Sequence, residues 1–369
     1  MLDRRQFITA ASLATAAVAT SGWAATTPPR QPLKILLLGG TRFIGIPITE
    51  LATQRGHTVT LFNRGKTNAS LFPDVERITG DRSGALDGLK GRKWDAVIDT
   101  SAYVPRAVKM SAELLAPNIG QYLFVSSISV YPTFSEPRTE ESPVGTLKDP
   151  TVEKVDGETY GPLKALCEQA AQAAMPGRVT VLRPGLIVGP HDSTDRFTYW
   201  PARAARGGDM LAPGTPRDRI QVIDARDLAA FALDTLEHRA YGTFNVVSPP
   251  GMFTMGDVVG ESIRAAKAQA KPDTAPRAVW AKADFLEKQK VDGWTDMPVW
   301  LDARGDEAAF AATSSERAIK QGLKITPMRK TVTDTLAWHL KRPEAERAKL
   351  KAGLDPTREQ EVLKALRNA

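Results

Sequence analysis

The feature that most constrains the fold is a glycine-rich turn placed directly after a continuous apolar segment. The segment begins at Leu33 and reads LKILLLGGTRFIGIPITELATQRGHTVTLFNRG. Its fully apolar start predicts a strand buried on both faces, as in a parallel sheet covered by helices. An amphipathic helix and a second strand over 58–62 follow, so the segment predicts a βαβ unit.

The glycines of this turn are suited to binding a diphosphate. Three glycines would let the backbone approach the phosphates, and the helix N-terminus favours negative charge. A glycine pattern alone is weak evidence, but its place between a buried strand and a helix makes dinucleotide binding the expected function. We expect phosphate contacts from Gly39, Gly40, Thr41, Arg42, Phe43, Ile44 and Gly45.

The turn also carries a family resemblance. It is similar to that of the extended short-chain dehydrogenase/reductase superfamily, in particular the NAD-dependent epimerase/dehydratase family, whose turn typically reads GxxGxxG. Arg42 stands in place of the middle glycine, and GGTRFIG resembles an atypical branch that includes chloroplast stem-loop-binding proteins. Arg42 could add a cation near the phosphates or point into solvent.

The residues after the second strand bear on the choice between NAD and NADP. An NAD site usually presents a carboxylate to the ribose 2′-hydroxyl, and here the strand ends in Asn63 and Arg64. Arg64 could pair with a 2′-phosphate, which favours NADP over NAD. Asn63 could equally bond a ribose hydroxyl.

Two further strands are expected to add cofactor contacts. The resemblance places Asp81 and Arg82, at the end of ERITGDR, beside the adenine; a turn-capping role for Asp81 is the alternative. It also implies that Thr100 and Ser101, at the end of WDAVIDTSAY, lie near the cofactor.

The candidate catalytic pair lies in YGPLKALCEQAAQAA, which predicts a helix. Tyr160 and Lys164 are four residues apart and therefore share one helix face. An ammonium beside the phenol would lower the pKa of Tyr160 and make it a usable acid or base. Since this spacing is common on solvated helix faces, the prediction depends on the order of the motifs along the chain.

That order is the glycine turn, a buried strand ending in SSISVY, YGPLK, and then VTVLRPGLIVGP. The resemblance selects Ser127, with Ser126 as the near neighbour, to hydrogen-bond the substrate oxygen. It also implies that Lys164 holds the nicotinamide ribose and that the segment from Pro184 passes the nicotinamide.

These patterns predict an α/β protein with a Rossmann-type doubly wound parallel sheet and a smaller C-terminal α/β substrate-binding lobe. We expect the dinucleotide domain over 34–190, with elements near 219–248 returning to it, and the substrate lobe over 191–340. Aromatic and charged residues in the lobe are candidates to line the pocket, namely Trp200, Trp280, Trp294, Trp300, Asp192, Arg196, Arg217 and Arg219. Residues 341–369 predict a charged helical tail, either solvated or a partner surface.

The N-terminus predicts export. DRRQFI contains paired Arg4 and Arg5 and precedes a mildly apolar Ala/Thr-rich run, which resembles a bacterial twin-arginine signal peptide over 1–24. Residues 25–33 predict a linker. The expected location is the periplasm or another exported site, with the twin-arginine machinery as a partner.

Composition narrows the remaining options. The single cysteine, Cys167, cannot form an internal disulfide, and the four histidines are too scattered for a metal cluster, so we expect no metal. The net charge of +7 comes from basic residues interleaved with acidic ones. The sequence also shows no basic stripe with interleaved aromatic residues. For both reasons, nucleic acid is not an expected partner.

The sequence predicts an NAD(P)-dependent epimerase/dehydratase-type oxidoreductase. It would act on a secondary alcohol or keto group of a sugar-like substrate and recycle a tightly bound cofactor. The alternatives are a simple NADPH-dependent reductase and a non-catalytic nucleotide- or RNA-binding protein. The resemblance also permits a homodimer.

Overall fold

The computed structural model describes residues 31–369, and the centre of this part is a seven-stranded parallel sheet in the order β11-β6-β5-β4-β1-β2-β3. The predicted signal segment and most of the linker lie outside the described residues. The strands are β1 (Lys34–Leu38), β2 (Thr58–Asn63), β3 (Glu76–Thr79), β4 (Ala96–Asp99), β5 (Gln121–Val125), β6 (Val179–Pro184) and β11 (Gly242–Val246).

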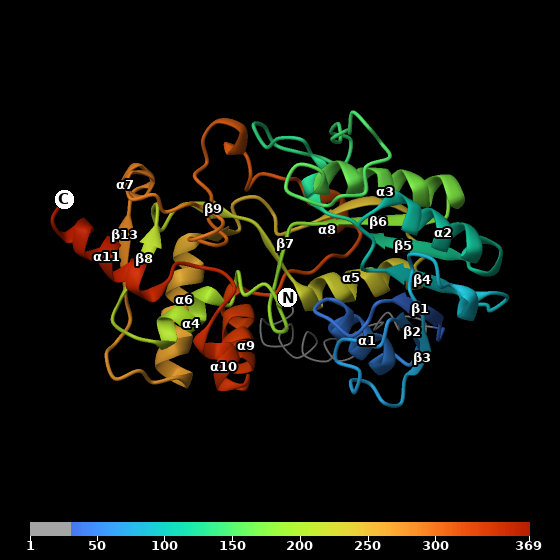
Figure 1. Ribbon diagram of the computed structural model, residues 1–369, viewed down its shortest axis with the longest axis horizontal. Coiled ribbons are helices and arrows are strands. Elements are labelled where there is room, and N and C mark those ends of the chain that lie inside the picture. The colour runs from blue at the N-terminus through green and yellow to red at the C-terminus, as the bar shows by residue number, and fades with distance from the viewer. Residues whose placement is uncertain (1–30) are drawn as a thin grey trace, which may run out of the picture. The chain divides into compact units, whose positions relative to one another are not determined.

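Helices cover both faces of this sheet, as the apolar strands require (Figure 1). In β1, Ile35 and Leu37 pack into the core beneath one pair of helices, whereas Leu36 and Leu38 pack into the core beneath the other. The first pair is α1 (Gly45–Gln54) and α5 (Ala225–Glu237), and the second is α2 (Pro105–Leu115) and α3 (Tyr160–Ala174). The doubly wound parallel sheet predicted from the sequence is confirmed.

Two boundaries differ from the sequence predictions. The run from 109 to 116 predicts a helix, and in the structure this helix begins earlier, at Pro105, because proline is well suited to a first helical position, where no amide partner is needed. The apolar run VTVLRPGLIVGP predicts one buried strand leaving the sheet, but in the structure the run is divided. β6 stays in the central sheet, and β7 (Leu186–Val188) leaves it to pair with β10 (Val222–Asp224).

A second core lies beyond these crossing strands and holds 29 buried residues, among them Trp200, Met255 and Leu336. Two small pairs of strands belong here: parallel β8 (Asp209–Pro213) with β13 (Arg277–Ala281), and antiparallel β9 (Arg219–Ile220) with β12 (Phe253–Thr254). The helices of this region are α4 (Tyr199–Ala205), α6 (Met255–Gln269), α7 (Ala283–Lys288), α9 (Met328–Leu340), α10 (Glu344–Ala348) and α11 (Pro356–Arg367). The short helix α8 (Glu316–Lys320) packs instead against β11 of the central sheet, with Ala318 in the core of that sheet. Short 3₁₀ turns occur at Asp87–Leu89, Ala116–Asn118, Ile128–Val130 and Gly305–Glu307.

The charged C-terminal segment is helical, as predicted, but it is not a free solvated tail. Val362 and Leu363 on α11 are fully buried in the second core, and Glu359 is buried against Arg203 of α4. One apolar helix face and ion pairs to Arg203 and, from Arg342, to buried Asp195 therefore hold the segment against the rest of the protein. No helix among residues 31–369 is long and apolar enough to cross a membrane.

Candidate active site

The carboxyl ends of the central strands open into a cavity of about 840 Å³. This volume falls within the range of small-molecule and cofactor sites. The loops after five strands of the sheet, β1, β2, β3, β4 and β5, meet here, joined by the start of α3 and the segment after β6. The cavity is lined by all of the predicted site residues except Gly45, namely Gly39, Gly40, Thr41, Arg42, Phe43, Ile44, Asn63, Arg64, Asp81, Arg82, Thr100, Ser101, Ser127, Tyr160, Lys164 and Pro184.

The glycine turn requires glycine for packing. Gly39 and Gly40 have φ angles of 124° and 98°, a region that side-chain-bearing residues rarely adopt. A Cβ on Gly40 would lie 2.5 Å from the Leu61 side chain, and one on Gly45 would lie 2.7 Å from the Gly40 backbone. Gly45 therefore brings the helix against the turn rather than lining the cavity.

This turn fits a dinucleotide phosphate. Among residues 31–369, the backbone amides from 40 to 44 donate to no protein acceptor, and they precede the ten-residue helix α1. The basic residues Arg42, Arg64 and Lys66 line the same cavity. Free amides, a helix N-terminus and nearby cations together favour a diphosphate here.

Several predicted cofactor contacts also brace the loops. Asn63 donates to the Gly39 carbonyl at 2.9 Å and accepts from the Gly65 amide at 2.9 Å, so its amide group is already bonded. The Asp81 carboxylate accepts from the Ser83 amide at 2.8 Å, which is the turn-capping contact considered as the alternative.

Arg82 is engaged with a buried acid. Its Nη1 donates to Asp99 Oδ1 at 2.6 Å and to the Ser101 hydroxyl at 3.0 Å. The Arg82 charge and hydrogen bonds hold the pKa of Asp99 below its usual value even though burial acts to raise it. Thr100 donates to the Leu38 carbonyl at 2.9 Å, which ties the fourth strand to the glycine turn.

The two adjacent serines differ in their surroundings. Ser126 is buried and donates to Glu168 at 2.5 Å, and Glu168 is in turn paired with Arg183. Ser127 begins a 3₁₀ turn and bonds Ser129, lines the same cavity as Tyr160, and acts to lower the pKa of the Tyr160 phenol against the larger effect of burial. The structure therefore brings Ser127 and Tyr160 together, while Ser126 belongs to a buried polar network.

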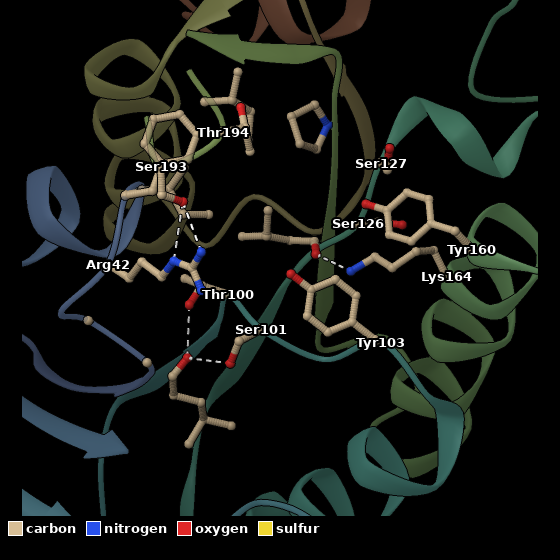
Figure 2. Close-up of a pocket in the computed structure, with 18 of the residues that line it drawn as sticks. Arg42, Thr100, Ser101, Tyr103, Ser126, Ser127, Tyr160, Lys164, Ser193 and Thr194 are labelled. Atoms are coloured by element: carbon tan, nitrogen blue, oxygen red, sulfur yellow. Dashed lines mark hydrogen bonds between the residues drawn. The ribbon is translucent and has the colours of Figure 1, made fainter. Parts of the chain in front are cut away.

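The predicted effect of Lys164 on Tyr160 is not present in this structure. Lys164 is 3% exposed, and its Nζ donates to the carbonyls of Val125 at 2.7 Å and Ala102 at 2.9 Å. Figure 2 shows one of these two bonds. Burial raises the pKa of Tyr160, and Lys164 is not among the groups that act on it. The expectation of a lowered phenol pKa is wrong here, because the ammonium is directed toward backbone carbonyls.

Lys164 should make the stability of the protein depend on pH. Burial lowers its pKa from the ordinary 10.5 to about 8. Between these values the unfolded chain binds more protons, so the free energy of unfolding should rise as the pH increases from about 8 to 10.5. We expect urea unfolding to show wild-type stability increasing relative to Lys164→Met across this interval and a constant difference below it. The exposed Lys93→Met variant should follow wild type, and a pH-independent Lys164→Met difference would contradict the prediction.

Several cavity residues were missed by the sequence analysis. The Tyr103 ring centroid lies 6.2 Å from that of Tyr160, and Phe134 and Phe310 lie 5.1 Å apart. Tyr103 directly follows the predicted cofactor strand and could have been found from that position. Phe134 and Phe310 come from distant loops, and no local pattern marks them.

Of the candidates in the substrate region, Arg196 and Trp294 line the cavity. Trp200 and Trp300 are core residues, 0% and 3% exposed. The others, Asp192, Arg217, Arg219 and Trp280, lie outside the cavity lining. Among residues 31–369 there is no group of three or more His, Cys, Asp or Glu residues that could hold a metal ion.

Comparisons with known proteins agree with this fold. Residues 97–247 match the model of the NAD dependent epimerase/dehydratase family. The chain is 27% identical over 232 residues to the chloroplast stem-loop binding protein of 41 kDa b of Arabidopsis thaliana, a match covering 58% of each protein. It is also 27% identical over 295 residues to the epimerase family protein SDR39U1 of Bos taurus, covering 70% of this chain and 91% of that protein.

A solved structure shares the fold. The Bordetella bronchiseptica enzyme WbmH, in complex with NAD+, superposes with a TM-score of 0.62 at 16% identity, covering 84% of this chain and 99% of that one. The segment that matches the family model, residues 97–247, begins in β4 and ends just after β11, and so contains Ser127, Tyr160 and Lys164. The comparisons thus relate this chain to the NAD dependent epimerase/dehydratase family through residues 97–247 and through its similarity to an epimerase family protein.

Proposed function

We propose that this protein is an NAD(P)-dependent oxidoreductase of the epimerase/dehydratase type that acts on a secondary alcohol or keto group of a sugar-like substrate. The proposal rests on one observation. The glycine turn and the residues Ser127, Tyr160 and Lys164 line the same cavity. A diphosphate site and a proton-transfer group sharing one cavity are what hydride chemistry on a bound nicotinamide requires.

The roles of the residues follow from their placement. The bound nicotinamide would supply the hydride acceptor and donor. Tyr160 would move the proton to or from the substrate oxygen, and Ser127 would hydrogen-bond that oxygen. Lys164, already bonded to two backbone carbonyls, would hold the cofactor ribose and fix the position of α3 against the strand ends.

The predicted export favours cofactor recycling. The twin-arginine route carries folded proteins, so the cofactor would be loaded before export, and a free nicotinamide pool is not expected outside the cytoplasm. We infer that the nucleotide is retained and regenerated within each turnover, with an exported carbohydrate as substrate. Fractionation of cells making wild type or Arg4→Lys/Arg5→Lys tests the location, and loss of the protein from the periplasm in the double variant is expected.

The test of the function is native mass spectrometry of the purified mature protein. A nucleotide should be present at near-stoichiometric level and be identified as NAD or NADP after release. Protein that carries no nucleotide and turns over only with added NADPH would instead support the simple reductase.

Retention of the bound nucleotide should depend on a contact across the cavity. Arg42 donates from Nε and Nη2 to the Ser193 hydroxyl at 3.3 and 3.0 Å, joining the glycine turn to the loop after β7 (Figure 2). We expect Ser193→Ala and Arg42→Gly to increase the dissociation rate of the nucleotide about 3- to 10-fold, because each loses one or two hydrogen bonds. Release into excess unlabelled nucleotide measures the rate. The exposed Ser70→Ala variant should match wild type, and unchanged rates in both cavity variants would contradict the prediction.

The preference for NADP should depend on Arg64. Arg64 is exposed, lines the cavity beside Lys66, and follows β2 with no acid in its place. We expect Arg64→Ala to weaken NADP binding about tenfold, the effect of one charge-assisted hydrogen bond, and to leave NAD binding unchanged. Titration of nucleotide-free protein with each dinucleotide measures both affinities. Tighter binding of NAD than NADP by wild type would show that the preference is the opposite one.

A further inference from the structure

Arg196 and Trp294 form a pair on the wall of the cavity that Tyr160 also lines. The Arg196 guanidinium lies over the Trp294 ring, 5.4 Å from its centroid. The two residues are far apart in the sequence, one after β7 and the other before α8. The fold therefore brings a cation and an aromatic ring together in the region where the substrate must meet the candidate acid–base group.

A short relay of hydrogen bonds orients the guanidinium. Arg196 Nε donates to the Thr194 hydroxyl at 3.1 Å, and that hydroxyl donates to Asp192 Oδ1 at 2.6 Å. Asp192 is fully buried, which anchors the relay in the protein. Only the Nε side of the Arg196 guanidinium is used in this way.

The other two nitrogens of Arg196 have no protein partner. Among residues 31–369, no carboxylate lies within ion-pair distance of Arg196, and neither Nη1 nor Nη2 makes a hydrogen bond. Burial lowers the pKa of this guanidinium, and the charge of Asp192 acts in the opposite direction without offsetting it. A half-buried guanidinium with two free donors favours an anionic ligand.

Trp294 is held rigidly. Its φ angle is 65°, a strained value for a large residue, and its amide donates to the carbonyls of Met297 at 3.1 Å and Trp300 at 2.9 Å. The Phe310 ring packs edge-on against it at 5.6 Å. Strain of this kind persists where the surroundings fix it, and it is common at ligand-binding sites.

We propose that Arg196, supported by Trp294, binds an anionic oxyacid group of the substrate, either a carboxylate or a phosphate ester. The substrate would then be a sugar acid or a sugar phosphate rather than a neutral sugar. The planar guanidinium can bind such a group through two parallel hydrogen bonds from Nη1 and Nη2. The inference rests on the proposed function, since it names the substrate class of the same cavity.

The test compares charged ligands with neutral ones of the same shape. Purified protein with its bound nucleotide is titrated by calorimetry with D-glucuronate, D-galacturonate and the amide of each, and with D-glucose 6-phosphate and D-glucose. We expect one of the charged ligands to bind about 10- to 100-fold more tightly than its neutral counterpart, the effect of charge-assisted hydrogen bonds. Preference for an acid over its amide identifies a carboxylate, and preference for the 6-phosphate over glucose identifies a phosphate ester.

Variants connect the preference to Arg196. Arg196→Gln should abolish the preference for the charged ligand. Arg196→Lys should retain part of this preference, because a point charge replaces the bidentate group. The exposed Arg217→Gln variant should keep the full preference. Each variant is first shown to unfold at the wild-type temperature. Equal binding of charged and neutral ligands throughout the panel, or a preference that survives in Arg196→Gln, overturns the proposal. The readout is the affinity of each ligand and not its turnover, so this result does not depend on whether Tyr160 is catalytic.

Discussion

Replacement of Tyr160 by phenylalanine is expected to reduce kcat by a factor of about 10² to 10⁴, the usual contribution of a general acid or base. The substitution removes one hydroxyl from a half-buried side chain, so the fold and the bound nucleotide should be retained. Burial raises the pKa of Tyr160. The phenol therefore stays protonated at neutral pH unless bound ligands change its surroundings. Turnover on the best-bound ligand of the sugar panel, with nucleotide occupancy measured in parallel, gives the result.

The matched control is Tyr241→Phe, which makes the same chemical change on an exposed tyrosine outside the cavity. It should retain wild-type turnover. Retained turnover in Tyr160→Phe would count against the enzyme proposed here. Salt-sensitive RNA binding by the same protein would then favour the non-catalytic nucleic-acid-binding alternative.

Removing the Glu359 carboxylate is expected to cause the largest loss of stability, about 3–5 kcal/mol of unfolding free energy. Glu359 and Arg203 are 1% and 4% exposed, and Arg203 Nε lies 2.7 Å from Glu359 Oε1. The same oxygen accepts from the Leu211 amide at 3.0 Å. Glu359→Ala leaves the Arg203 charge buried without its counterion, and urea unfolding measures the cost.

Glu361 provides a control on the same helix. It pairs with Arg358 at 2.9 Å, but the two side chains are 59% and 40% exposed. Because solvent screens such pairs, Glu361→Ala should change the stability by about 0–1 kcal/mol. Hydrogen exchange should show faster opening of α11 and β8 in Glu359→Ala only. Equal stability of the two variants would mean that α11 is held by its apolar face alone.

The cofactor half of the molecule was predictable because its signals are local. The apolar run of β1, the glycine turn and α1 follow one another without interruption, and each has a recognisable period or residue type. The order of YGPLK after SSISVY likewise placed Tyr160 at the start of a helix and Ser127 at the end of a buried strand. The direction of the Lys164 side chain could not be predicted, because it depends on carbonyls 39 and 62 residues away in the sequence.

The sequence by itself determined the parallel sheet, the glycine turn and the order of the candidate catalytic residues, since these depend on periodicity and on residues close together in the chain. Only the tertiary structure decided which charged and aromatic residues of the second lobe reach the cavity. It also decided that α11 is docked on β8, and that Arg196 meets Trp294. These contacts join segments tens to more than a hundred residues apart, and their partners are selected by packing and by pairing of buried charge, which leave no local pattern in the sequence.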